Sequence, residues 1–536
     1  MVEATFGLEA KHKLSEGVSV LAEAVGATLG AAGRNVVIEE GYGIPHVTKD
    51  GVTVARSIEL KDPIANMGAQ MVKEVAIKTN DEVGDGTTTA TVLADAMIQR
   101  GLELITKHVN PVQVKKGMNQ ACQDIIQKIK ESAIPVKEDM ASLKNVASVS
   151  ANNDEEIGEI VVTALRSVNK NGIISVEQSN DMETYIDVVN GMELNRGYIT
   201  PYFITDMNKM NCVLEDALIL ITDIRLSNTQ DILDKLDYAV REHKSLLIIS
   251  PNVEGELLTT LIRNKVGGVI RVAAIKAPGY GAKQKDVMQD IAILTGGKFI
   301  SNEEGINIQD TDVDILGSAK KVVISKDKTL IIEGGGKKED VAARIEQIQS
   351  QKNSLTNAYD KEQLNMRAAK LAGGVAVLYV GAATEVEMKE KKDRVDDALA
   401  ATRAAVEEGI VPGAGMCLFN IAEEYFNRTL AHADLTPTDY EMGCDLVYKA
   451  LYRPSNLILE NAGLDIHEFS DELFAEPNKA FGVDSLKGEV VDLYEKGIID
   501  PAKVEIVALR YAVSVASTIL TVECTINNEK VVDSSK

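Results

Sequence analysis

The most distinctive chemistry in this sequence lies in Asp85, Gly86 and the three threonines that follow, at the start of a stretch whose pattern predicts a helix running to Gly101. Backbone N–H groups at a helix N-terminus attract anions, threonine hydroxyls add hydrogen bonds, and a carboxylate is a typical Mg²⁺ ligand. These residues therefore predict a site for a phosphate chain and Mg²⁺. Asp and Thr are equally common at ordinary capped helix starts, so the motif alone leaves both interpretations open.

Two further acids, Asp50 and Asp397, are the other candidates for chemistry. The pattern around Thr48–Gly51 predicts a turn between two strands, the second at Val52–Ala55, and Lys-Asp-Gly is typical of an ordinary hairpin turn. Asp397 lies in a charged stretch that predicts a helix from Glu385 to Glu408, where an acid on the helix surface is usually solvated. Taken singly, neither residue indicates catalysis.

Helices near both ends of the chain must position these residues. Apolar residues at helical spacing predict helices at residues 9–29, 63–83, 111–132, 153–169 and 504–517. Asp62 and Pro63 form a good cap and first-turn pair for the second of them, and Pro135 predicts a break after the third. A glycine loop at Gly409–Gly415 opens another helical stretch.

The middle of the chain has a different pattern. Continuous apolar strands alternate with helices, which predicts a parallel sheet covered by helices; the strands are 218–222, 246–250 and 269–275, and the helices 228–242 and 254–266. A hairpin at 321–332 and two helices, 339–352 and 360–371, follow. Gly191 and Gly374 bracket this segment, so we expect a separate domain inserted into another.

The composition excludes several classes of protein. With 81 acidic and 57 basic residues the net charge is −24, which disfavours nucleic acid and anionic membranes as partners. No apolar run approaches 18 residues, and the six histidines show no zinc-binding spacing. The five widely spaced cysteines and the absence of a basic or amphipathic leader indicate a reducing compartment, and we expect a cytoplasmic protein.

Several segments together resemble the group I chaperonins, the GroEL or 60-kDa heat-shock family. The matching segments follow the family's order from about residue 6 to 525 and are Thr28–Gly30, Thr48–Val52, Asn66–Ala76, Asp85–Leu93, Arg196–Tyr198, Pro201–Phe203, Lys370–Val377, Val380–Lys392 and Ala401–Gly409. The string Gly381–Lys392 is too specific to arise from fold physics alone. The resemblance implies a multidomain α/β fold with a mainly α-helical equatorial domain, in the GroEL-like three-domain architecture with the apical α/β domain inserted.

The resemblance also assigns the domains and the hinges. It implies equatorial parts at 1–134 and 409–536, intermediate parts at 135–190 and 375–408, and an apical domain at 191–374. The hinges would be Pro135, Gly191, Gly374 and Gly409.

Carried over position by position, the resemblance implies a Mg²⁺-dependent ATPase. Asp50 and Asp397 would orient the attacking water as the catalytic residues, and Asp85 would hold Mg²⁺. The ATP-binding residues would be Thr28, Leu29, Gly30, Ala31, Lys49, Asp85, Gly86, Thr87, Thr88, Thr89, Ala414, Gly415, Asp484, Ser485, Leu486 and Asp500. The family also implies K⁺ as a further cofactor. Ala31 and Ala414 depart from the family's usual proline and glycine, and Asp484-Ser485-Leu486 from its Asn-Ala-Ala.

The family's apolar substrate-binding surface falls on the middle domain. The corresponding residues are Tyr198, Tyr202, Phe203, Leu233, Leu236, Leu258, Ile262 and Arg263, the last of which replaces the family's valine. From the sequence pattern alone, the broad apolar faces of the two helices around Leu233 and Leu258 would be interpreted as core.

The function implied is an ATP-dependent chaperonin that captures non-native polypeptides on an apolar apical rim and promotes their folding in a ring-shaped chamber. Its partners would be unfolded polypeptides, further copies of itself in a ring of 7 or 14 chains, and a co-chaperonin of the 10-kDa class. The alternatives are an ATP-dependent small-molecule enzyme, which the absence of a P-loop or kinase signature disfavours, and a non-hydrolysing ring scaffold, which the presence of Asp50, Asp85 and Asp397 disfavours.

Overall fold

In a computed structural model, the chain forms two compact units. The model describes residues 2–39, 45–105, 109–136, 139–151, 153–167, 173–179, 182–207, 209–279, 282–304, 307–354, 358–372, 375–429, 437–469, 472–473 and 480–528. Unit 1 comprises residues 1–162 and 382–536, and unit 2 comprises residues 163–381. Gly374, one of the predicted hinges, lies outside the described residues.

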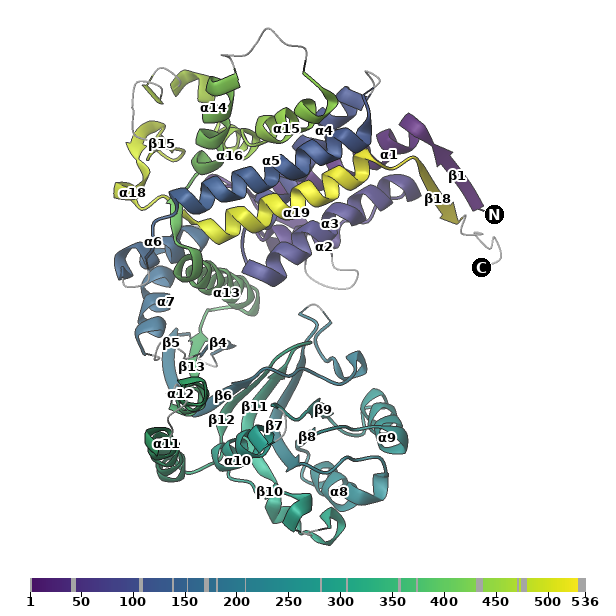
Figure 1. Ribbon diagram of the computed structural model, residues 1–536, viewed down its shortest axis with the longest axis vertical. Coiled ribbons are helices and arrows are strands. Elements are labelled where there is room, and N and C mark those ends of the chain that lie inside the picture. Colours follow the sequence, from purple (N-terminus) through teal and green to yellow (C-terminus); the bar gives the residue numbers. More distant parts are fainter. Residues whose placement is uncertain are drawn as a thin grey trace. The chain divides into compact units, whose positions relative to one another are not determined.

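Long helices build unit 1, and several of them run alongside one another (Figure 1). They are α1 (Gly7–Gly26), α3 (Pro63–Val83), α4 (Thr87–Ile105), α5 (Pro111–Ser132), α15 (Asp439–Ala450) and α19 (Ala502–Leu520). Aliphatic side chains at helical spacing, such as Leu14, Met97 and Leu509, meet in one buried core. Because α19 packs on α3, α4 and α5, the two ends of the sequence form this core together, as predicted for a chain with an inserted domain.

Polar caps fix where the helices near the predicted site begin. Asp62 accepts hydrogen bonds from the N–H groups of Ile64 and Ala65, which confirms the predicted start of α3 at Pro63. Asp50 caps α2 (Gly51–Ser57) in the same way. The predicted strand at Val52–Ala55 is therefore wrong: the Asp50 carboxylate satisfies the first N–H groups of a helix, so Lys-Asp-Gly starts α2 instead of turning a hairpin.

Shorter elements complete unit 1. The strand pairs are all antiparallel: β1 (Val2–Phe6) with β18 (Cys524–Asn528), β2 (Val36–Ile38) with β3 (His46–Thr48), β14 (Ile410–Pro412) with β17 (Ile499–Pro501), and β15 (Phe481–Asp484) with β16 (Glu489–Asp492). The other helices are α6 (Met140–Ser150), α7 (Glu155–Ser167, continuing into unit 2), α13 (Glu385–Glu408), α14 (Met416–Thr429), α16 (Arg453–Ala462) and α18 (Leu493–Lys496). The pairing of β14 with β17 brings the glycine loop after residue 409 beside Asp500.

Unit 2 is built on a mixed sheet of order β6-β12-β11-β7-β8-β9, with β10 paired to β7. Its strands are β6 (Gly191–Leu194), β7 (Cys212–Thr222), β8 (Ser245–Ser250), β9 (Val272–Lys276), β10 (Phe299–Ile300), β11 (Gly317–Ile324) and β12 (Thr329–Gly334). The parallel arrangement predicted for β7, β8 and β9 is confirmed, whereas β6, β11 and β12 are antiparallel. A second sheet joins β4 (Ile173–Gln178), β13 (Val375–Val380) and β5 (Tyr185–Val189).

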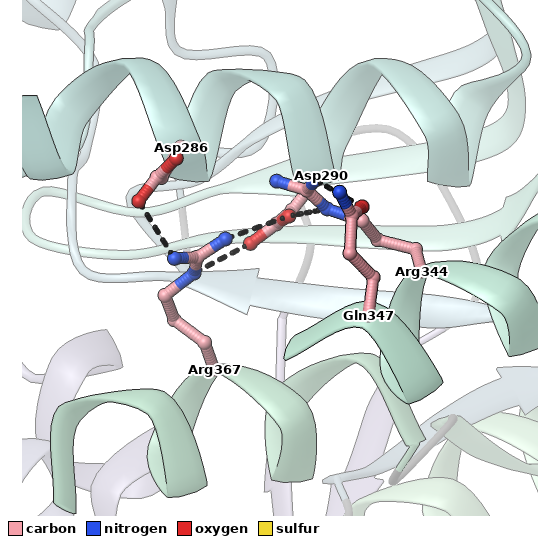
Figure 2. Close-up of polar contacts among 5 residues, drawn as sticks. All are labelled: Asp286, Asp290, Arg344, Gln347 and Arg367. Carbon is pink, nitrogen blue, oxygen red and sulfur yellow. Dashed lines mark hydrogen bonds and ion pairs between the residues drawn. The ribbon is translucent and has the colours of Figure 1, made fainter. Parts of the chain in front are cut away.

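Helices cover the larger sheet, and a buried carboxylate ties three of them together. The helices are α8 (Leu233–Arg241), α9 (Gly255–Val266), α10 (Ala282–Thr295), α11 (Lys338–Ser354) and α12 (Ala358–Ala372). Asp290 on α10 is almost fully buried and accepts hydrogen bonds from Arg344 of α11 and Arg367 of α12, as Figure 2 shows. Asp286, one turn earlier, also binds Arg367 at 2.9 Å. Two acids of α10, of which Asp290 is the buried one, therefore hold α11 and α12 to this helix.

Candidate functional site

Unit 1 contains a cavity of about 540 Å³ whose wall comes from many distant parts of the sequence. Every residue predicted above as catalytic, ATP-binding or metal-binding lines it: Thr28, Leu29, Gly30, Ala31, Lys49, Asp50, Asp85, Gly86, Thr87, Thr88, Thr89, Asp397, Ala414, Gly415, Asp484, Ser485, Leu486 and Asp500. The fold thus gathers in one place residues that local sequence patterns could not connect.

One end of the cavity is suited to an anion. The first turn of α4 begins directly after Gly86, and the Ala90 N–H bonds back to the Gly86 carbonyl at 2.9 Å. The N–H groups of the residues between them therefore have no partner within the helix. Thr28 approaches this turn, with its hydroxyl 3.4 Å from that of Thr88. Backbone donors, hydroxyls and the helix dipole converge where a phosphate chain would need them.

Asp50 reaches this end of the cavity as the cap of α2. Its Oδ1 accepts from the Val52 N–H at 3.1 Å, and its Oδ2 accepts from the N–H and the hydroxyl of Thr53 at 3.0 and 2.5 Å. Gly51 lies so close to α4 that a Cβ there would be 2.4 Å from the Thr88 hydroxyl. The capping interaction therefore fixes Asp50 beside the threonines.

Asp85 is held from two sides. The N–H of Gly86 donates to its Oδ1 at 2.5 Å, and the hydroxyl of Ser150 donates to its Oδ2 at 2.8 Å. Burial raises the pKa of Asp85, while these two hydrogen bonds oppose the rise and the nearby Asp50 adds to it. Sequence reasoning missed Ser150, since a serine at the last position of α6 carries no local signal of its role.

Asp397 projects from α13 into the same cavity, so the interpretation as a solvated surface acid does not hold. Burial raises its pKa well above the usual value, and the charges of Asp50, Asp85, Asp396 and Asp393 raise it further. One turn earlier on α13, Arg394 also lines the cavity and pairs with Asp154 at 2.8 Å.

Another part of the cavity wall carries apolar side chains beside the polar Asp484, Ser485 and Lys487. Pro454, Ile458, Val483 and Leu486 contribute to this part, beside the loop of Ala414 and Gly415. Ala414 adopts a left-handed backbone conformation with φ of 55°, which is unfavourable for a residue with a Cβ. A flat apolar group fits the chemistry of this end, as a phosphate chain fits that of the other.

Two acids lie on the cavity wall near the segment that starts α19. Burial and then the charge of Asp85 raise the pKa of Asp500 to about 7. Burial and then the charges of Asp500 and Asp85 raise the pKa of Glu505 to about 8. Asp500 was predicted from the sequence but Glu505 was not, because an acid in the first turn of an apolar helix is usually an ordinary partner of the helix N-terminus.

The residues predicted to bind polypeptides all lie in unit 2 but differ in exposure. Tyr202 and Leu233 are exposed by 66% and 38%, and Arg263 is exposed. Tyr198, Leu258 and Ile262 are half-buried against the core. Phe203 and Leu236 belong to the core, with exposed fractions of 0% and 9%. Further exposed apolar side chains, which the sequence analysis did not assign to this surface, are Met207, Met210, Val240, Val266 and Val269.

The predicted hinges have different surroundings. Next to Pro135, Ile134 forms an antiparallel bridge with Ile410, the residue after Gly409, so these two predicted hinges lie side by side in unit 1. Gly191 begins β6 in unit 2, where a Cβ would be 2.6 Å from the Ile331 carbonyl oxygen. No room exists there for a larger side chain.

The described residues form neither a cluster typical of a metal site nor a helix typical of a membrane span. No group of three or more His, Cys, Asp or Glu side chains in this part of the chain is arranged to hold a metal ion. No helix in it combines the length and the apolar character that a membrane span needs. All five cysteines are unpaired, and Cys122, Cys212 and Cys417 are buried.

Known proteins with a similar sequence or structure identify the fold. The chain is similar to the chaperonin gp146 from bacteriophage EL 2 (Pseudomonas aeruginosa), crystallised in the presence of ATP-BeFx. In crystal form II the identity is 24%, the TM-score is 0.67, and the match covers 98% of this chain and 99% of that one. In crystal form I the identity is 23% and the TM-score 0.63, with the same coverage. The model of the TCP-1/cpn60 chaperonin family matches residues 21–530. The chain therefore belongs to the TCP-1/cpn60 chaperonin family and has the GroEL-like multidomain fold.

Proposed function

We propose that this protein is an ATP-hydrolysing chaperonin that captures non-native polypeptides and promotes their folding in a ring-shaped chamber. The observation that carries the proposal is that Asp50, Asp85 and Asp397, from three distant segments, line one cavity with the N-terminus of α4. Membership of the chaperonin family supports the same function, and the similar gp146 was crystallised with ATP-BeFx.

The residues at the anion end fit Mg²⁺ and a triphosphate. Mg²⁺ usually keeps several waters and takes one or two carboxylates plus phosphate oxygens, so Asp85 alone is a sufficient protein ligand. The N–H groups at the start of α4, the threonine hydroxyls and Lys49 would hold the phosphates. Bound Mg²⁺ would supply charge neutralisation, which phosphoryl transfer requires more than covalent chemistry.

Asp50 and Asp397 would orient the water that attacks the terminal phosphate. The capping hydrogen bonds hold Asp50 in a fixed position, and α13 carries Asp397 to the cavity. The carboxylate of Asp397 would accept a proton from the water as it attacks. K⁺ would be a further cofactor, as in the family that the sequence resembles.

The exposed apolar side chains of unit 2 would bind non-native polypeptides. Tyr202, Leu233, Val240 and Val266 are exposed large apolar residues on or near α8 and α9, and such surfaces bind unfolded chains without sequence preference. Movement of an apical domain 191–374 about Gly191 and Gly374 would withdraw this surface after ATP binding, with intermediate parts at 135–190 and 375–408 and further hinges at Pro135 and Gly409.

We further propose a ring of 7 or 14 copies, with a co-chaperonin of the 10-kDa class as a partner and the cytoplasm as location. Arg263, exposed on α9, would alter the choice of polypeptide or the docking of the co-chaperonin. Native mass spectrometry with and without ATP tests the ring directly, because a mass of 7 or 14 chains is expected. A monomer under all conditions would contradict it.

The test of the ATPase is the substitution Asp397→Ala. We expect nucleotide affinity to stay within a few-fold and the hydrolysis rate to fall by about 10²-fold or more, because the water loses its orienting group. The matched control is Glu408→Ala on the same helix, because this exposed acid does not line the cavity and its removal should leave ATP hydrolysis normal. Unchanged hydrolysis in the Asp397 variant would remove this residue from the mechanism.

A further inference from the structure

Glu505 is a buried acid on the cavity wall that the fold itself does not explain. Its exposed fraction is 4%, and it lines the cavity from the first turn of α19. Its Oε2 is buried and has no hydrogen-bond partner among the described residues. A buried carboxyl oxygen without a partner destabilises the fold, so an apolar residue would serve α19 better at this position.

The segment that carries Glu505 runs between the two ends of the cavity. At its beginning, Asp500 pairs with Val411 in the ladder of β14 and β17, close to the loop of Ala414 and Gly415. At its end, Val504 lies against Gly86, where a Cβ would be 2.4 Å from the Val504 side chain. Glu505 follows Val504 directly and is near enough to both Asp500 and Asp85 to feel their charges.

The chemistry of the two ends identifies what would lie between them. A nucleotide with its phosphates at the N-terminus of α4 and its base among Ile458, Val483 and Leu486 has its sugar between these regions. The ribose offers two hydroxyl groups as hydrogen-bond donors. A carboxyl group accepts such bonds whether it is ionised or neutral, since the neutral form keeps its carbonyl oxygen.

We propose that Glu505 is a specificity-determining residue that accepts a hydrogen bond from a ribose hydroxyl and so selects ribonucleotides over deoxyribonucleotides. The inference rests on the proposed nucleotide site and adds a contact to it. The ligand hydroxyl would give the carboxyl the partner that it lacks in the free protein. The terminal torsion of a glutamate is soft, so the carboxyl group can turn toward the sugar without a change of rotamer in the rest of the side chain.

The test is a set of binding measurements by calorimetry with ADP, 2′-deoxy-ADP and 3′-deoxy-ADP, which avoid hydrolysis. We expect the wild-type protein to bind ADP about ten-fold more tightly than the analogue that lacks the contacted hydroxyl. Glu505→Leu should bind ADP about ten-fold more weakly and bind that analogue as the wild-type protein does, so that the preference disappears. Glu505→Gln, which keeps a carbonyl acceptor, should restore part of the preference.

Each outcome separates this proposal from the proposed function. No binding of ADP to the wild-type protein would contradict the nucleotide site itself. Binding without any preference for ribose, or a preference that Glu505→Leu retains for both analogues, would overturn only the role of Glu505. If Glu505 had only a structural role, Glu505→Leu would lower the affinity for all three ligands by the same factor. If Glu505→Leu does not fold, Glu505→Ala carries the same expectation, and the wild-type preference alone still decides whether a ribose contact exists.

Discussion

The hydroxyl of Ser150 donates a hydrogen bond of 2.8 Å to Oδ2 of Asp85, a residue 65 positions earlier in the chain. This bond joins the end of α6 to the loop that starts α4. It leaves the other carboxylate oxygen to the N–H of Gly86. The position of the candidate Mg²⁺ ligand therefore depends on a helix that the sequence motif does not include.

Removing this bond with Ser150→Ala should raise the Mg²⁺ concentration needed for half-maximal ATP hydrolysis by about ten-fold, because groups that orient a metal ligand contribute about that much to metal affinity. The loss should also raise the pKa of Asp85 further, since the Ser150 hydrogen bond lowers it. The control is Ser142→Ala on the same helix, whose hydroxyl donates a hydrogen bond to the exposed Asp139, away from the cavity. An equal Mg²⁺ requirement in both variants would contradict the role of Ser150.

The left-handed backbone at Ala414 predicts that Ala414→Gly stabilises unit 1. Such a conformation is unfavourable by about 1–2 kcal/mol for alanine. Glycine avoids this strain, but it also makes the unfolded chain more flexible, which lowers the free energy of unfolding by about 0.4–1 kcal/mol. We expect the free energy of unfolding to rise by roughly 0.5–1 kcal/mol, measured with urea. Ala133→Gly, at a residue with φ of −68°, should instead lower it. A loss of stability at both positions would show that Ala414 is not strained.

Asp290→Asn should loosen the attachment of α11 and α12 in unit 2. The substitution removes the buried negative charge that Arg344 and Arg367 share, and breaking such an ion pair typically destabilises a protein by about 3–5 kcal/mol. Amide hydrogens of α11 and α12 should exchange much faster. Asp286→Asn on the same helix removes a half-exposed pair, for which about 0–1 kcal/mol is expected. Similar amide hydrogen exchange rates in both variants would show that the buried Asp290 stabilises α11 and α12 no more than the exposed Asp286 does.

Leu233 and Leu236 lie one turn apart on α8, and the family resemblance assigns both to the polypeptide-binding surface. Leu233 is exposed, whereas Leu236 is buried. Leu233→Glu should leave the fold intact and reduce the capture of a chemically unfolded protein, measured by suppression of its aggregation. Leu236→Glu should destabilise unit 2 instead, because it places a charge in the core. Circular dichroism during heating distinguishes the two results. Normal capture by a folded Leu233 variant would remove this position from the binding surface.

The burial of Glu505 predicts how stability depends on pH. Its pKa is about 8 in the folded chain against an ordinary value of 4.5, so between these values the unfolded state releases a proton that the folded state retains. Stability therefore falls as pH rises through this window, by at most about 1.4 kcal/mol per pH unit for one group. Glu505→Gln has no such proton and should gain more stability at pH 8 than at pH 5. An equal change at both pH values would mean that Glu505 ionises normally.

The sequence by itself determined the elements with strong local signals. The cap at Asp62 and Pro63 predicted the start of α3, helical patterning predicted α5, and a long charged stretch predicted α13 with its observed bounds. Continuous apolar runs predicted β7, β8 and β9 as a parallel group. The resemblance of the motifs also identified eighteen residues of the cavity, because the residue types in a motif and the order of the motifs carry information that hydrophobic periodicity does not.

Only the tertiary structure decided the features that depend on residues distant in sequence. Lys49-Asp50-Gly51 has the composition of a hairpin turn, yet Asp50 caps a helix. In this helix Val52 and Val54 are both buried in the core of unit 1. Ser150 and Glu505 carry no local signal, because their roles arise from what α6 and α19 are packed against. Exposure at Leu233 and burial at Leu236 likewise follow from the sheet beneath α8. The sequence specifies which groups the chain has, whereas packing specifies which of them lie together in one cavity.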